Sequence, residues 1–231
     1  QLNVAINPDF GQVESDELVV NFSSSETFYS DKRPFFSENH SLFDVKGFTY
    51  FYLINTRRIG AAPDYNCSRF EGSLKDYCES SQLGINDIDY AIRYNQQGET
   101  LDFGFLGASE ADETFSEGRD FYSLRARKNF EDFSLGYLGT HTDRAVLDRT
   151  ADVHSMDLVY RYSDKTRIDA IYITSDTEQG IDNSEKSGEA FRFRLTSSPS
   201  SQRYTDAFLF FFDEDTDLSL IHISEPTRRV F

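Results

Sequence analysis

Residues 88–105 read IDYAIRYNQQGETLDFGF, and this stretch decides the fold. In both of its halves, aromatic or branched side chains alternate with charged or small ones, and the polar segment at 95–99 lies between them. An alternation with a period of two predicts strands whose two faces meet different surroundings. The stretch therefore predicts an antiparallel hairpin with one apolar face and one charged face.

The same alternation continues to residue 213, and no stretch with the period of a helix competes with it. The aromatic share of 15% also favours strands. The predicted strands are 47–56, 87–95, 100–107, 120–128, 133–140, 153–162, 166–174, 189–196 and 203–212.

The connections between these strands alternate in length. The short ones are 95–99, 129–132, 163–166 and 197–202, and the long polar ones are 108–119, 141–152 and 175–188. An up-and-down antiparallel sheet places all short turns at one edge and all long loops at the other, as outer-membrane barrels do. The long segment 57–86 is then expected at the long-loop edge.

The alternating side chains divide into an apolar and a charged set. The apolar set is Ile88, Tyr90, Ile92, Leu101, Phe103, Phe105, Tyr122, Leu124, Phe133, Leu135, Tyr137, Met156, Leu158, Tyr160, Phe191, Phe193, Leu195, Phe208 and Phe210. The charged and polar set is Asp89, Arg93, Asp102, Arg125, Arg127, Ser134, Asp157, Arg161, Arg192 and Arg194. The prediction is an all-β, antiparallel, up-and-down transmembrane β-barrel, present as an incomplete, open-edged fragment, with the apolar set towards the lipid bilayer and the charged set facing the lumen.

The same alternation is compatible with a soluble β-sandwich whose apolar face points inward. Loop asymmetry and strand length favour the barrel. Two details fit it poorly: Asp206 shares the parity of Phe208, and strand 166–174 mixes Ile171 with Arg167 on one face.

Composition excludes some classes of function. The net charge of −17 on 231 residues argues against nucleic acid as a partner, because phosphate binding needs basic patches. We expect the two cysteines, Cys67 and Cys78, to form a disulfide in an oxidising compartment, and two free thiols are the alternative. Their spacing fits no metal site, and we predict neither a metal nor a cofactor.

The chain begins at Gln1 without a signal peptide, so we expect it to be part of a longer one. LSLIHISEPTR at 218–228 resembles the conceptual translation of a transposase sequencing adapter. The natural sequence is then expected to stop near Asp217. The predicted organisation is a motif segment at 1–46 leading into the barrel, barrel strands at 47–217, and an adapter translation at 218–231.

Three motifs carry a family resemblance: NPDFGQVESDELVVNF at 7–22, SETFYSDKRPFFSEN at 25–39 and RRIGAAP at 57–63. Together they resemble domain-of-unknown-function family 5916 of Bacteroidota and Gammaproteobacteria. The resemblance implies a family-9-like carbohydrate-binding domain upstream, a barrel in the outer membrane of a Gram-negative bacterium, and a carbohydrate ligand. Some members carry a hydrolase label, but the resemblance supplies no catalytic residue. This sequence departs from the family pattern by lacking the upstream domain and the rest of the barrel.

Acidic residues cluster in the first motif. Asp9 and Glu14, with Asp16, suit a calcium site or a carboxylate pair for glycoside cleavage. Turn chemistry around Asn-Pro-Asp is the simpler interpretation, and we favour it.

Basic residues gather in the second and third motifs. Three interpretations are open for these residues. They form an internal network with Asp9 or Glu14, they bind an anionic ligand, or they make surface ion pairs of little energy. The basic residues are Lys32, Arg33, Arg57 and Arg58, and the acidic Glu38 follows the first two. The arginines of the charged strand face have two interpretations: selection of anionic solutes, or pairing with aspartates across strands. We favour pairing.

The function expected from the sequence is that of an outer-membrane β-barrel protein of undefined activity, in transport or surface binding linked to carbohydrate. A barrel-associated or periplasm-facing hydrolase acting on glycans is one alternative, and a soluble binding module is another. No catalytic residue is predicted.

Overall fold

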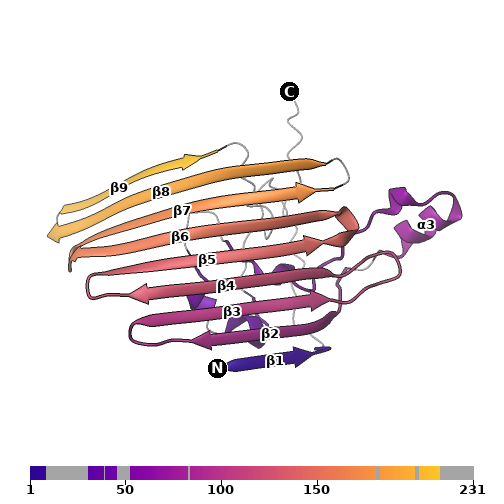
Figure 1. Ribbon diagram of the computed structural model, residues 1–231, viewed down its shortest axis with the longest axis horizontal. Coiled ribbons are helices and arrows are strands. Elements are labelled where there is room, and N and C mark those ends of the chain that lie inside the picture. Colours follow the sequence, from indigo (N-terminus) through magenta and orange to yellow (C-terminus); the bar gives the residue numbers. More distant parts are fainter. Residues whose placement is uncertain are drawn as a thin grey trace.

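The computed structural model describes residues 1–8, 31–38, 40–45, 53–82, 84–180, 183–200 and 203–213. Within them, nine antiparallel strands follow one another in the order β1 to β9 and form a single sheet (Figure 1). The strands are β1 (Leu2–Ile6), β2 (Ile88–Gln96), β3 (Leu101–Glu110), β4 (Arg119–Asn129), β5 (Phe133–Arg144), β6 (Arg149–Ser163), β7 (Thr166–Gln179), β8 (Ser184–Ser200) and β9 (Arg203–Phe212). The all-β, up-and-down prediction is confirmed. The sheet does not close into a barrel, and β1 and β9 are its two edges.

Short helices fill some of the connections. They are α2 (Pro34–Ser37), η1 (His40–Leu42), η2 (Thr56–Arg58), η3 (Cys67–Arg69), α3 (Ser73–Ser80) and η4 (Ala145–Leu147). None of the helices in the described ranges has the length and apolar character needed to cross a membrane.

Figure 1 shows the two edges of the sheet that the loop lengths predicted. The turns after β2, β4 and β6 lie at one edge, and α3 projects beyond the other. In segment 57–86, α3 therefore lies at the long-loop edge, as expected.

The prediction of long loops at 141–152 and 175–188 was wrong. β5 continues to Arg144 and β6 begins at Arg149, so only η4 and Asp148 connect them, while β7 and β8 extend to Gln179 and from Ser184. These extensions carry polar side chains on both faces, such as Thr142 and Asp143, so no apolar alternation marked them as strands.

The predicted strand at 47–56 was also wrong in its described part, because residues 53–55 are not extended into a strand and η2 begins at Thr56. Residues 46–52 lie outside the described residues.

The two faces of the sheet differ in burial. On one face, Arg125 is 3% exposed, and Leu106, Leu138 and Ile173 are buried on the same face. We call this the covered face. Segments 31–38, 40–45 and 53–64, which we call the covering segments, lie against it behind β2 to β5 in Figure 1 and add an apolar core to it. Their core residues are Phe36, Leu42, Phe43, Val45, Leu53, Ile54 and Ile59.

The opposite, open face keeps large apolar side chains uncovered. Leu135 is 46% exposed, Met156 63%, and Leu124 39%. The predicted division into two faces therefore exists, and the charged face is the one that is packed.

Four assignments to the two faces were wrong. A β-bulge between Ile88 and Tyr90 turns Ile88 to the covered face, where it is buried, and leaves Asp89 exposed. Phe208 and Phe210 lie directly opposite Arg194 and Arg192, on the charged side.

The same register explains the two details that fitted the barrel poorly. Asp206 shares the side of Arg194 and pairs with it at 2.7 Å. Ile171 shares the covered face with the charged residues of β7 because it packs in the apolar core.

Cys67 and Cys78 are joined in a disulfide with a Cα–Cα distance of 5.7 Å. The bridge links η3 to α3, and the rings of Phe70 and Tyr77 both pack edge-on against Phe115 of the β3–β4 connection. The bridge thus joins the two helices into one unit, and the aromatic contacts hold that unit at the long-loop edge.

Replacing both Cys67 and Cys78 with serine should lower the free energy of unfolding by about 2–3 kcal/mol, because the cross-link restricts the unfolded chain. A urea titration followed by circular dichroism measures the change. Reduced wild-type protein is the control and should match the double variant. Equal stability of the oxidised wild type and the variant would contradict the prediction.

Candidate functional site

The strongest concentration of buried charge lies between the covering segments and the covered face. Arg33 is its first centre: its guanidinium binds both carboxylate oxygens of Asp31 at 3.0 and 2.7 Å, and donates to the carbonyls of Thr56 and Ile59 at 2.6 Å each. The Thr56 hydroxyl donates to the same carboxylate at 2.8 Å. Pro34 opens α2 directly after this arginine, where a missing N–H costs nothing. One buried ion pair thus ties the first covering segment to the third.

Two sheet arginines hold the first two covering segments. Arg93 on β2 binds the Glu38 carboxylate at 2.5 Å and the Glu38 carbonyl at 2.6 Å, and also donates to the Phe35 carbonyl. Arg125 on β4 binds Asp157 of β6 through both carboxylate oxygens and donates to the Leu42 carbonyl at 3.2 Å. The guanidinium forks therefore satisfy backbone carbonyls that the covering segments bury.

Two further arginines hold the third covering segment. Arg119 binds the buried Glu110 carboxylate at 2.6 and 2.8 Å and donates to the Ala61 carbonyl at 3.1 Å. The same carboxylate accepts the Gly60 N–H at 2.7 Å. Arg144 binds Asp64 at 2.7 and 2.5 Å. Breaking a buried pair of this kind by removing one partner costs about 3–5 kcal/mol.

Two glycines make the close approach possible. Gly60 has a φ of +79°, which lets its N–H reach Glu110. At Gly104 a Cβ atom would lie 2.7 Å from the Phe43 ring and 2.8 Å from Leu42. The second covering segment therefore packs directly against the backbone of β3 at Gly104.

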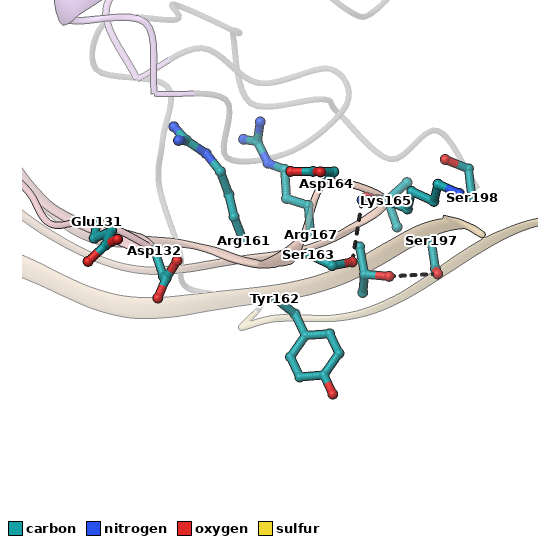
Figure 2. Close-up of a pocket in the computed structure, with 12 residues that line it drawn as sticks. Glu131, Asp132, Arg161, Tyr162, Ser163, Asp164, Lys165, Arg167, Ser197 and Ser198 are labelled. Atoms are coloured by element: carbon teal, nitrogen blue, oxygen red, sulfur yellow. Dashed lines mark hydrogen bonds between the residues drawn. The ribbon is translucent and has the colours of Figure 1, made fainter. Parts of the chain in front are cut away.

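Polar pockets lie at the short-turn edge, away from this network. The larger pocket has a volume of about 730 Å³, and Figure 2 shows Arg161 and Arg167 on one side of the sheet within it and Tyr162 on the other. A second pocket of about 420 Å³ shares both arginines and adds Arg127.

The structure brings together only part of the predicted site. Arg33, Arg93, Arg125 and Asp157 join the buried network, and Glu38 pairs with Arg93 at its margin, with a side chain that is 52% exposed. Asp9 and Glu14 lie outside the described residues, as does Asp16.

The remaining predicted residues lie elsewhere on the sheet or at its margin. Arg127 pairs with Asp102 at 2.8 Å. Lys32 is exposed beside Arg33, and Arg57 and Arg58 lie in η2, where the Arg58 carbonyl accepts from Arg119 at 3.4 Å. Arg192 lies opposite Ile171 on the charged side of β8.

Sequence reasoning missed five members of the network: Asp31, Asp64, Glu110, Arg119 and Arg144. Arg119 has the same parity as Arg125, so extending the predicted strand 120–128 by one residue would have found it. Nothing in the local pattern marks Asp64, because its partner lies 80 residues away.

The chemistry of this network is structural. Its carboxylates are held by guanidinium groups, and the described residues contain no group of three or more His, Cys, Asp or Glu side chains that could hold a metal ion. The arrangement locks the covering segments onto the sheet.

Comparison with known proteins addresses the first part of the chain. The sequence model of a family described as a domain of unknown function, DUF5916, matches residues 1–86. The match covers β1, the covering segments and the disulfide-linked helices, and ends just before β2. No curated protein matches the sequence. The upstream carbohydrate-binding domain stays a prediction. Over residues 1–86, this chain is therefore similar to the DUF5916 family of domains of unknown function.

Proposed function

We propose that the sheet is part of the wall of an outer-membrane β-barrel and that the covering segments fill its interior as a plug. The observation that carries the proposal is the reversed burial of the two faces. Arg93, Arg119 and Arg125 are buried, while Leu135 and Met156 are exposed. A soluble sandwich would bury the apolar face and hydrate the charged one.

The composition of the open face supports the lipid assignment. Tyrosines flank the apolar side chains: Tyr137 donates to or accepts from His154 at 2.8 Å, and Tyr122 stacks on His141. Aromatic rings with a polar end are typical of membrane interfaces. On β6 the apolar residues run from Met156 to Tyr162, about 20 Å along the strand, somewhat shorter than the ~25 Å band typical of such barrels.

The apolar band also shifts along the strands as it crosses the sheet. In register, Leu124 on β4 lies opposite Gly139 and then the polar His154, whereas Leu135 lies opposite Leu158. Strands tilted against a horizontal band produce such a shift.

The interior position of the covering segments supports binding or gated passage more than an open pore. Since these segments bury apolar and charged groups against β2 to β6, passage along this wall would require their displacement. The link to carbohydrate rests on the family resemblance alone. The alternative of a glycan hydrolase rests on Asp9 and Glu14, which the structure does not describe, and it stays a prediction.

The sequence contains no tryptophan, so a single introduced tryptophan reports its own surroundings. Phe105→Trp on the open face should be strongly quenched by phospholipids brominated on their acyl chains, because the ring would lie in hydrocarbon. Fluorescence of the protein reconstituted in vesicles measures this.

Phe121→Trp is the matched control, because Phe121 lies on the neighbouring strand β4 but on the covered face, 9% exposed. It should be little quenched. Quenching of neither ring, or stronger quenching of the Phe121→Trp variant, would overturn the membrane assignment.

A further inference from the structure

The charged face continues beyond the covering segments to the short-turn edge, where two arginines stand opposite each other. Arg161 of β6 and Arg167 of β7 are direct cross-strand partners. Figure 2 shows both side chains extending to the same side of the sheet, and Tyr162 pointing to the opposite side. Both arginines line both pockets of this edge. Two like charges facing each other across strands are unfavourable unless an anion lies between them.

The other ion pairs of this region leave Arg161 uncompensated. Arg167 pairs with Asp169 at 2.5 Å, Arg127 with Asp102, and Arg194 with Asp206. In the part of the chain that the structure describes, the Arg161 guanidinium has no ion pair, and its backbone N–H alone donates, to the Asp132 carbonyl at 2.8 Å. The Arg161 side chain is exposed to the pocket.

The smaller pocket has the composition of an anion site. Three arginines line it, and Glu99 is the single carboxylate in its lining. Asn129 and Ser134 add neutral hydrogen-bonding groups, and the rings of Phe130 and Phe133 stack at 4.2 Å along the same wall. The larger pocket carries three carboxylates, from Glu131, Asp132 and Asp164. The smaller pocket is therefore the more favourable place for an anion.

We propose that the smaller pocket binds the oxyanion of a soluble ligand, a carboxylate or phosphate group, bridged between Arg161 and Arg167. The planar Arg161 guanidinium presents parallel N–H groups that match two oxygens of such an anion. Arg167 already binds Asp169 through Nε and one terminal nitrogen, so it contributes its charge and its other terminal nitrogen. The arginines extend away from the open face, so the ligand reaches them from the aqueous side and not from lipid. The site depends on the pairing of β6 with β7 alone and stands whether or not the sheet lies in a membrane.

Isothermal titration of the full chain in detergent micelles with citrate and with inorganic phosphate tests the site. Arg161→Gln should weaken binding about tenfold or more, because a charge-assisted pair of hydrogen bonds is lost. Binding to the wild type should also weaken as salt is raised. Arg161→Lys keeps the charge but not the fork, and its affinity should fall between those of the wild type and Arg161→Gln.

Arg194→Gln is the matched control, because Arg194 lies on the same side of the sheet, is partly exposed, and already pairs with Asp206. Its affinity should stay within about twofold of the wild type, as a screened charge at a distance has little effect. No binding by the wild type, or an equal loss in both glutamine variants, would overturn the proposal. If Arg161→Gln fails to fold, wild-type affinity in Arg161→Lys would contradict it.

Discussion

Arg119→Ala should lower the free energy of unfolding by about 3–5 kcal/mol, because the substitution leaves the Glu110 carboxylate buried without its partner. The Glu110 side chain is 0% exposed and that of Arg119 is 3% exposed, so the pair is shielded from solvent in the intact protein. The variant also leaves the Ala61 carbonyl without its donor at 3.1 Å. Urea titration in detergent micelles, followed by circular dichroism, measures the loss.

The control is Arg194→Ala, which removes an arginine of comparable pairing distance from an exposed site. Arg194 is 42% exposed and binds Asp206 at 2.7 Å, so its loss should cost no more than about 1 kcal/mol. Adding Glu110→Gln to Arg119→Ala should recover part of the stability, since a neutral amide is cheaper to bury than a carboxylate. If Arg119→Ala costs no more than Arg194→Ala, the buried network is not what holds the third covering segment.

The strands were predictable because the alternation of side chains is local. Ile92, Arg93 and Tyr94 already separate the two faces of β2, and the register pairs them with Gly107, Leu106 and Phe105. The prediction failed where a local irregularity or an ambiguous pattern intervened. The bulge at Ile88 inverts the parity of a single residue, which no period reveals.

In β9 both parities carry aromatic or branched side chains, so hydrophobicity could not select the face. Asp206 is the one charged residue between Tyr204 and Phe212, and its pairing with Arg194 fixes the side. A carboxylate that can pair with an arginine is a better guide to the face of a strand than one of several phenylalanines. An unpaired charge is costly to bury, so fewer positions accept it.

The buried network was only partly predictable, because its contacts join residues far apart in sequence. Arg93 meets Glu38 across 55 residues and Arg144 meets Asp64 across 80. The strand pattern identified Arg93 as a residue of the charged face, but nothing in it distinguishes a cross-strand partner from a carbonyl on a covering segment. The packing that decides between them is tertiary.

Gly104→Val should displace the second covering segment from the sheet. Its Cβ would lie 2.7 Å from Phe43 and 2.8 Å from Leu42, and Leu42 also presents its carbonyl to Arg125. Overpacking at a buried position costs about 1–3 kcal/mol, and here both contacts are with large side chains that are themselves buried. Backbone amides of residues 40–45 should therefore exchange hydrogen about ten- to a hundredfold faster, the equivalent of that cost at a local opening.

The matched control is Gly107→Val, on the same strand but on the open face. There the added Cβ would meet the Phe105 ring at 3.2 Å and an Ile92 methyl at 3.3 Å, contacts that side chains with an uncovered face above them can relieve. Exchange at residues 40–45 should be unchanged in this variant. Hydrogen–deuterium exchange with mass spectrometry separates the two results. Faster exchange in both variants would mean that strand β3 itself is disturbed, and unchanged exchange in Gly104→Val would mean that the covering segment does not depend on the bare backbone beneath it.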